Sequence, residues 1–263
     1  MALIVMCCYD TLENKRTTLT SQTLESLYKT VDFNRHKIII VNNNSCEETK
    51  QTIDSFVYRV NEFVCNDAAQ AIHLTQNIGT AKAINLGWSK REPGQHCVKI
   101  DNDVVIHSKG WVDEMEEAIR RAPHIGIIGL KRKDLIECTT HETPEWRSEL
   151  WQLPHEPGER WIAIEVVKGV MGTCKMVNSK LIDAIGYLSQ PTVYGFDDSI
   201  YSCRSSLAGF INCFLPHIEI DHIDLGGDAY TEWKRKHAGQ TISYAQQLIA
   251  EYQRGVRPLY EPA

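Results

Sequence analysis

Three short apolar runs, each followed at once by polar residues, constrain the fold of this chain more than any other feature. They are Leu3–Cys8, residues 37–41 and Cys97–Ile100. Continuous apolar runs of this length are typical of strands that are buried on both faces of a parallel sheet. The segments between them place apolar residues such as Leu24 and Leu27 on one helical face. The alternation predicts an α/β fold, with a mostly parallel central sheet and helices on both faces.

The rest of the chain continues this pattern. Residues 139–160 contain three prolines and little periodicity, which is typical of a long functional loop. Residues 229–254 predict a helical tail, and without a repeat or linker we expect one domain over residues 1–263. Further helices are predicted at 47–58, 81–89, Trp111–Arg121, Ser179–Ile185 and 199–208, and further strands at 63–64, 72–74, 125–130, 162–167 and 172–177.

The polar residues that follow the three apolar runs should lie close together. They are Tyr9 and Asp10, residues 42–45, and residues 101–103. In open α/β sheets, ligands bind just beyond the carboxyl ends of the parallel strands. We therefore expect these polar groups to line one edge of the sheet and to form a binding site there.

Composition excludes several classes of protein. Lys and Arg number 28 against 34 Asp and Glu, and the net charge of −6 excludes a uniformly basic surface for nucleic acid. The nine cysteines include no CxxC pair, so a structural zinc site is not expected. No apolar stretch approaches the roughly 20 residues of a membrane span, and the chain opens on a strand instead of a signal peptide. We therefore expect a cytoplasmic globular protein.

Motifs of other nucleotide-binding enzymes are missing after the first strand. Residues 10–15 contain no glycine, whereas a dehydrogenase would place G-x-G-x-x-G there. A sugar nucleotidyltransferase would likewise need a glycine-rich first turn. The sequence also lacks a P-loop, so these classes are excluded.

The clearest chemical feature is Asp101-Asn102-Asp103, at the end of the third apolar run. Two carboxylates at positions i and i+2, on a turn that leaves a sheet, can hold a hard divalent cation that also binds a diphosphate. Such a triplet also occurs in ordinary turns. The choice between the two interpretations depends on the rest of the sequence.

Further motifs favour the metal. They are the strand that ends in Tyr9-Asp10, the turn of residues 42–45, the N-x-G and A-x-N-x-G pattern of residues 77–87, the triplet 101–103, Gly169-Val170-Met171-Gly172, Asp197-Asp198 with Arg204 and residues 208–210, and His222 with Gly226-Gly227. In this order they resemble the GT-A glycosyltransferases, and glycosyltransferase family 2 in particular. The resemblance extends over roughly residues 3 to 227.

The resemblance implies a GT-A fold and a nucleoside-diphosphate-sugar donor, with a UDP-sugar favoured. It implies Mn²⁺ or Mg²⁺ as cofactor, held by Asp101, Asp103 and His222. It divides the chain into a donor-binding half, residues 1–110, an acceptor and catalytic half, residues 111–227, and a lid with a helical tail, residues 228–263. The donor-binding residues that it implies are Tyr9, Asp10, Asn42, Asn43, Asn44, Asn77, Gly79, Lys82, Asp101, Asn102, Lys234 and Lys236.

The resemblance also implies a catalytic acidic pair, Asp197 and Asp198. In an inverting transfer the acceptor hydroxyl must lose a proton, and we predict Asp198 as the general base that takes it. Arg204 is predicted to hold the pair by an ion pair, and Asn85 to hold the loop before Asp101. An alternative role for the pair is to cap the helix that follows.

The sequence departs from the family pattern at two positions, and the acceptor and the mechanism stay open. Asn42 stands where the family commonly has Asp, and Ile200 replaces the third acid of the acidic motif. The acceptor is a glycan or another hydroxyl compound; a hydroxylated DNA base is an alternative, for which the basic runs 131–133 and 234–237 would bind phosphate. The sequence is also compatible with a retaining reaction, and with a non-catalytic module that binds a nucleotide sugar.

Overall fold

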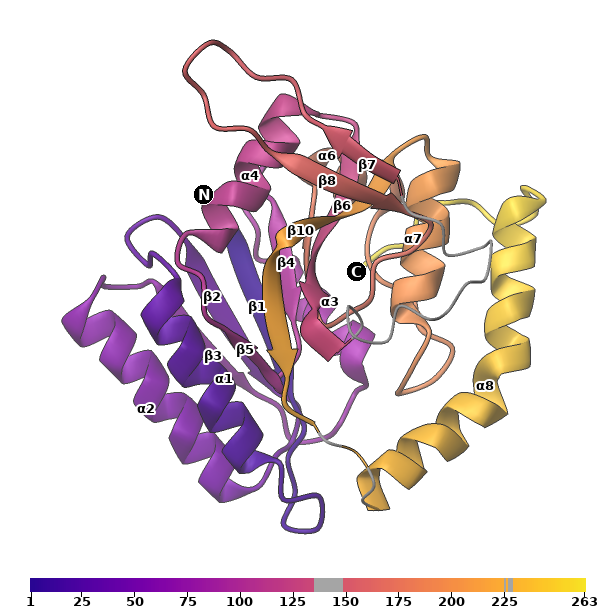
Figure 1. Ribbon diagram of the computed structural model, residues 1–263. Helices are drawn as coiled ribbons and strands as arrows, with labels where there is room; N and C mark the ends of the chain where they lie inside the picture. Colours follow the sequence, from indigo (N-terminus) through magenta and orange to yellow (C-terminus); the bar gives the residue numbers. More distant parts are fainter. Residues whose placement is uncertain (135–148, 225, 227–228) are drawn as a thin grey trace.

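The first half of the chain builds a parallel sheet, as the apolar runs predict (Figure 1). β1 (Leu3–Cys8) lies between β2 (Lys37–Asn42) and β4 (Cys97–Ile100), and β3 (Ala69–His73) follows β2; all three pairings are parallel. The computed structural model describes residues 1–134, 149–224, 226 and 229–263, and all structural statements concern these residues.

The second half of the chain extends this sheet with strands of both directions. The order is β3-β2-β1-β4-β9-β6-β10-β8-β7, and β5 pairs with the end of β10. β9 is antiparallel to both of its neighbours, whereas β6 and β10 are parallel to each other. The amino end of β9 therefore lies at the same edge as the carboxyl ends of β1, β4 and β10. The bounds are β5 (Val104–Ile106), β6 (Ile125–Arg132), β7 (Glu149–Gln152), β8 (Ala163–Val167), β9 (Cys174–Val177) and β10 (Ile211–His222).

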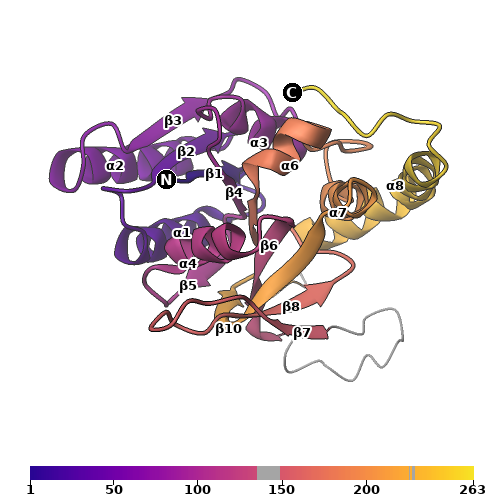
Figure 2. The same cartoon turned by 90° about the horizontal axis from the view of Figure 1, so that it is seen from above.

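Helices cover both faces of the sheet, which explains why its central strands are mostly apolar (Figure 2). Along β1, Ile4 and Met6 belong to one core, whereas Leu3 and Val5 belong to the core on the other face. The first core is closed by α1 (Thr17–Thr30), α2 (Glu47–Phe63) and α4 (Trp111–Arg121). The second is closed by α3 (Thr80–Trp88), α6 (Ser179–Ile185) and α7 (Asp197–Leu207).

A last helix, α8 (Ala229–Gln253), packs on the outside of α7 (Figure 1). Ala245, Leu248 and Tyr252 of α8 form a small separate core with Ile200 of α7. In the described part of the chain, no helix combines the length and the apolar character needed to cross a bilayer.

The fold confirms the predicted α/β class and most of the predicted elements. The strand predicted at residues 63–64 is wrong, because Phe63 is the last residue of α2. The predicted loop of residues 139–160 lies outside the described residues up to residue 148, and its remainder contains β7. β5 and β10 were not predicted, although β10 supplies a residue of the candidate site.

Candidate active site

The three polar turns meet at one edge of the sheet, as predicted, and hydrogen bonds join them. The backbone N–H of Asn43 donates to the carbonyl oxygen of Cys8 at 2.8 Å. The N–H of Asp10 donates to Ser45 Oγ at 3.0 Å, and Asn102 Nδ2 donates to Asp10 Oδ1 at 2.9 Å. The edge is therefore one hydrogen-bonded unit and not three independent turns.

Several residues predicted to bind the donor serve to build this edge. Asp10 has no exposed surface and accepts hydrogen bonds from Thr20 Oγ1 at 2.5 Å and Thr49 Oγ1 at 3.3 Å. Burial raises its pKa above the ordinary value. Asn42 and Asn43 are also buried; Asn42 Oδ1 accepts from the N–H of Ser45 at 2.7 Å. We therefore assign these side chains to supporting the edge. Tyr9 is half-buried and Asn44 is exposed.

The segment before α3 is held by side chains as well. Asn43 Nδ2 donates to Asn77 Oδ1 at 2.8 Å, and this oxygen also accepts from the N–H of Gly79 at 2.9 Å. Gly79 has φ +89°, and a Cβ there would lie 3.0 Å from the Cα of Val193. The glycine thus lets the backbone of residue 193 approach. Lys82 and Lys236 are exposed.

One cluster at the edge offers ligands for a divalent cation. It consists of Asp103, His222 and Asp224, each of which contributes a ligand atom within 4.8 Å of the others. The pairing of β5 with β10 brings them together, because His222 is the register partner of Val104 and the N–H of Ile223 donates to the carbonyl oxygen of Asp103 at 2.9 Å. Asp103 is 5% exposed, and its Oδ1 has no hydrogen-bond partner among the described residues. Carboxylate oxygens and an imidazole are suitable ligands for Mn²⁺, so the residues fit such an ion.

Two cations already contact the carboxylates of this cluster. Arg16, just before α1, contacts Asp103 Oδ2 at 2.5 Å and Asp224 Oδ2 at 2.8 Å. Lys234 of α8 contacts the same Asp224 oxygen at 2.8 Å. Burial alone would raise the pKa values of both carboxyl groups, but these contacts, with His222 beside Asp103, hold them below their ordinary values.

A second cluster surrounds Lys99 of β4. Its Nζ lies 3.1 Å from Asp197 Oδ2, 3.5 Å from Asp101 Oδ1 and 3.6 Å from Asp198 Oδ1. Lys99 is 3% exposed, whereas the Asp101 side chain is 37% exposed. Because Asp101 contacts Lys99, and the group of possible metal ligands consists of Asp103, His222 and Asp224, we assign Asp101 to the cluster around Lys99. Burial and the neighbouring carboxylates raise the pKa of Asp101 to about 6, against the opposing effect of Lys99.

The two members of the acidic pair have different surroundings. Asp198 Oδ2 accepts from the N–H of Gly172 at 2.8 Å, and Lys175 Nζ lies 4.0 Å from its Oδ1. Although burial opposes it, Lys99 and Lys175 hold the pKa of Asp198 well below its ordinary value. Burial and the charge of Asp198 raise the pKa of Asp197. The Asp198 side chain is 31% exposed and that of Asp197 only 7%, so Asp198 is the one that faces the edge.

Comparison with protein families matches residues 3–186 to the family described as glycosyl transferase family 2. The chain belongs to glycosyltransferase family 2. The predicted recognition and fold class are thereby confirmed. Comparison with curated protein sequences gives no match.

Solved structures with this fold are distant in sequence. The mannosyltransferase PcManGT from Pyrobaculum calidifontis, in complex with GDP-Man and Mn²⁺, has a TM-score of 0.66 at 14% identity, covering 90% of this chain and 60% of that one. GalNAc-T7 with UDP, GalNAc and Mn²⁺ has a TM-score of 0.60 at 14% identity, covering 84% and 44%. Residues 1–349 of S. aureus TarS give 0.58 at 17% identity, covering 96% and 71%. The chain thus spans only part of the length of these proteins.

Sequence reasoning missed four charged residues of this family 2 site. Lys99 and Lys175 each interrupt an otherwise apolar strand, and they are register partners across β4 and β9. This interruption was a usable signal. Asp224 follows His222 by two residues, and Arg16 had no signal in the sequence.

Two supporting roles were predicted incorrectly. Arg204 makes no ion pair with Asp197 or Asp198; it donates to the backbone carbonyls of Tyr187 at 2.7 Å and Leu259 at 2.7 Å. Asn85 holds the backbone of Leu188 through two hydrogen bonds and not the loop before Asp101. Gly227 of the predicted last motif lies outside the described residues.

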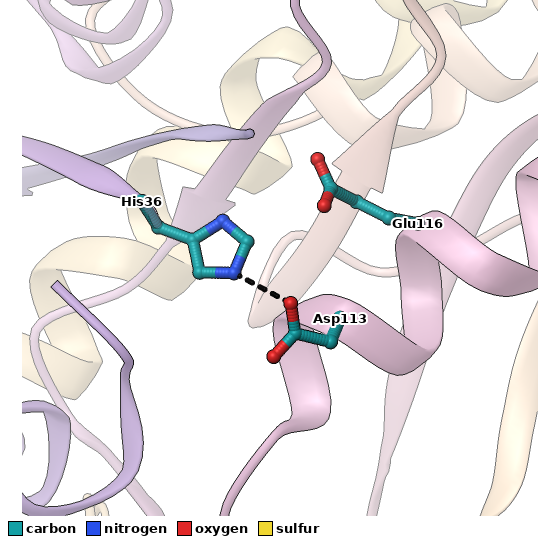
Figure 3. Close-up of side chains that lie close together, drawn as sticks. All are labelled: His36, Asp113 and Glu116. Atoms are coloured by element: carbon teal, nitrogen blue, oxygen red, sulfur yellow. Dashed lines mark hydrogen bonds and ion pairs between the residues drawn. The ribbon is translucent and has the colours of Figure 1, made fainter. Parts of the chain in front are cut away.

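A second group of possible metal ligands lies at the other end of the sheet, where β2 begins (Figure 3). His36 Nδ1 accepts from the N–H of Ala2 at 3.2 Å, and its Nε2 lies 3.0 Å from Asp113 Oδ1. Glu116 contacts the amino group of Met1 at 2.8 Å. Through these contacts the three side chains hold the start of the chain, just before β1, in place. We therefore assign no ion to them.

Proposed function

We propose that this glycosyltransferase moves a sugar from a nucleoside-diphosphate sugar, with UDP as the favoured nucleotide, to an acceptor hydroxyl in a metal-dependent, inverting reaction. One observation supports this most. A set of groups suited to bind a cation, Asp103, His222 and Asp224, and a separate carboxylate, Asp198 at the start of α7, lie at the same edge of one sheet. Donor activation and proton removal require two such groups.

The donor-binding part of the proposal rests on the cluster around Asp103. The residues that would hold Mn²⁺ or Mg²⁺ are Asp103, His222 and Asp224, with Asp101 left to contact hydroxyl groups of the donor. A cation held by these residues would supply positive charge to neutralise the departing diphosphate. Two of the structural neighbours are complexes with Mn²⁺ and either GDP-Man or UDP, which supports a nucleotide-sugar donor without selecting its base.

The transfer itself is assigned to Asp198. The acceptor oxygen forms a bond to the anomeric carbon as the bond from that carbon to the diphosphate oxygen breaks. The hydroxyl proton moves to the Asp198 carboxylate, and the nucleoside diphosphate leaves. The N–H of Gly172 and the ammonium group of Lys99 orient this carboxylate. Because its pKa lies below the ordinary value, Asp198 is deprotonated at neutral pH, which is the form a general base requires, although the same shift makes it a weaker base than an unperturbed carboxylate.

Nucleotide binding and turnover test this proposal together. Melting temperatures would be measured with UDP, GDP, CDP and dTDP, each with and without Mn²⁺, for the wild type, Asp103→Asn and Asp198→Asn. A ligand at about 100 times its Kd should stabilise the fold by roughly 2.7 kcal/mol, a shift of a few degrees. We expect a metal-dependent shift for one nucleotide, with UDP first. It should be lost in Asp103→Asn and kept in Asp198→Asn.

Hydrolysis of the matching sugar nucleotide then separates binding from catalysis. Asp198→Asn should bind the donor normally and lose at least about a hundredfold in turnover, the scale of general-base catalysis. Asp183→Asn, a change at a 58% exposed carboxylate on α6, is the matched control and should alter neither quantity. No shift with any nucleotide, in a protein that melts cooperatively, would refute the proposal.

A further inference from the structure

Among the described residues, two cations of the chain itself contact the carboxylates of the proposed metal site. Asp103 and Asp224 supply two negative charges, and their side chains are only 7% and 8% exposed. Arg16 bridges them from one side, and its side chain is 4% exposed. Lys234 approaches Asp224 from the side of α8. The formal charges of these four described side chains, Asp103, Asp224, Arg16 and Lys234, therefore balance one another.

This balance determines which ligand the group can take. A free divalent cation entering a neutral, buried group must approach two positive side chains, and the repulsion is large where water is mostly excluded. A divalent cation that arrives with a diphosphate brings negative oxygens along. These oxygens can replace the carboxylates as partners of Arg16 and Lys234, since an arginine presents several donors in a fork that suits phosphate.

We propose that Arg16 and Lys234 make the site bind the metal as its complex with the donor diphosphate and reject the free ion. In this arrangement the two side chains move from the carboxylates to the phosphate oxygens when the donor binds. Asp103 and Asp224 then become available to the cation. The inference rests on the proposed function, and it adds a coupling between metal and nucleotide that depends on two named cations.

Calorimetric titration of the purified chain tests this coupling without an activity assay. Mn²⁺ alone, UDP or GDP alone, and each nucleotide with Mn²⁺ would be titrated into the wild type and Arg16→Gln. We expect the wild type to bind Mn²⁺ at least about tenfold more tightly with nucleotide than without it. Arg16→Gln should bind Mn²⁺ alone on the order of tenfold more tightly than the wild type, and should bind nucleotide more weakly.

Two further variants show whether a change in Mn²⁺ binding comes from the lost positive charge or from a folding defect. Arg16→Lys keeps the charge and should behave as the wild type towards Mn²⁺ alone. Lys234→Met removes the more exposed cation, whose side chain is 21% exposed, and should strengthen binding of Mn²⁺ alone in the same direction as Arg16→Gln. Arg16→Gln without ligand should also melt below the wild type, and Mn²⁺ should restore it, because Asp103 and Asp224 lose their partner.

The outcomes separate the two proposals. A wild type that binds Mn²⁺ equally well with and without nucleotide overturns the coupling but leaves the proposed function in place. The same holds if neither Arg16→Gln nor Lys234→Met strengthens binding of Mn²⁺ alone. A wild type that binds neither nucleotide nor metal in any combination overturns both.

Discussion

At the scale of single residues, buried charge decides how the catalytic pair is held. Lys99 and Lys175 stand opposite each other on β4 and β9, and both are buried. Three carboxylates, Asp101, Asp197 and Asp198, lie within 4.0 Å of Lys99. Buried charges are stable only as a compensated set. The buried members, Lys99, Lys175 and Asp197, are therefore needed for the fold as well as for the position of Asp198.

Lys99→Met should destabilise the fold strongly. Removing one partner of a buried charge network typically costs about 3–5 kcal/mol, because it leaves the other charges uncompensated. The free energy of unfolding, from urea titration at pH 7, measures the effect. Lys37→Met is the control: the Lys37 side chain is 47% exposed in its contact with Glu92, and its loss should change stability by less than about 0.5 kcal/mol. Equal stability of the two variants would contradict this account.

Gly172→Ala should act on turnover more than on stability. A Cβ at residue 172 would lie 2.2 Å from Lys99 Nζ and 2.7 Å from Asp198 Oδ1, so both side-chain ends must move. A small displacement of these ends can keep their ion pairs and so costs the fold less than losing Lys99 would. Asp198 is then misplaced, however, and a shift of about 1 Å can cost on the order of a hundredfold in rate. Gly169→Ala is the control, because its Cβ would meet Ser202 only at 3.7 Å. Donor turnover and melting temperature of both variants check the prediction, which fails if the two variants turn over equally.

The sequence allowed only part of this site to be predicted, for a physical reason. Asp103, Asp198 and His222 lie in recognisable motifs, and the structure places them at one edge. Lys99 and Arg16 matter because of neighbours far along the chain, 98 residues away for Asp197 and 87 for Asp103. Asp10 has the residue type of a ligand, but its carboxylate oxygens already accept hydrogen bonds from Thr20 and Asn102. Local sequence does not reveal which polar groups the fold itself will use.

At the scale of elements, the segment after α8 ties the C-terminal end of the chain to α6 and α7 (Figure 2). The N–H of Glu261 donates to the carbonyl oxygen of Ile185 at 2.9 Å. The carbonyl oxygen of Glu261 accepts from the backbone N–H of Tyr187 at 2.8 Å. Arg204, with no exposed surface, donates to the carbonyl oxygen of Leu259 from α7. This segment therefore satisfies a fully buried guanidinium group.

Removing residues 256–263 should destabilise the fold by about 3 kcal/mol or more. Arg204 would lose Leu259 as acceptor, and hydrogen bonds to a charged donor contribute roughly 1.5–3 kcal/mol each. Removing only residues 262–263, beyond the last of these contacts, should change stability by less than about 0.5 kcal/mol. Urea unfolding of both truncated chains measures the difference. A long truncation as stable as the short one would show that Arg204 finds other acceptors.

The elements that the sequence predicted well are those with one dominant pattern. The helices Trp111–Arg121 and Ser179–Ile185 have the predicted bounds, because apolar spacing and flanking residues agree there. β10 escaped prediction because Pro216 and alternating charges at its end interrupt the apolar run, and its pairing with β6 shifts register between Leu215 and Glu219. Such an irregular strand is defined by its neighbours in the sheet and not by its own periodicity.

At the scale of the whole molecule, charge bears on the acceptor. The net charge is −6, and the first basic run is partly neutralised by carboxylates. Lys131 contacts Glu165 at 2.7 Å, and Arg132 pairs with Asp134. A duplex acceptor would need several lysines or arginines directed at phosphates. The ion pairs favour a glycan or another small hydroxyl compound over a hydroxylated DNA base.

We therefore predict that the chain binds duplex DNA no more tightly than non-specific binding allows at physiological salt. Fluorescence anisotropy with a labelled duplex, with and without a hydroxymethylated base, should give a Kd no tighter than the ~10⁻⁴–10⁻⁶ M of non-specific binding. Lys236→Met removes an exposed lysine of the second basic run and should leave this weak binding almost unchanged. A nanomolar Kd for the modified duplex, with a salt slope that falls by about one unit in Lys236→Met, would instead mean that this run binds the phosphate backbone. Such tight binding, selective for the hydroxymethylated base, would make a hydroxylated DNA base the favoured acceptor.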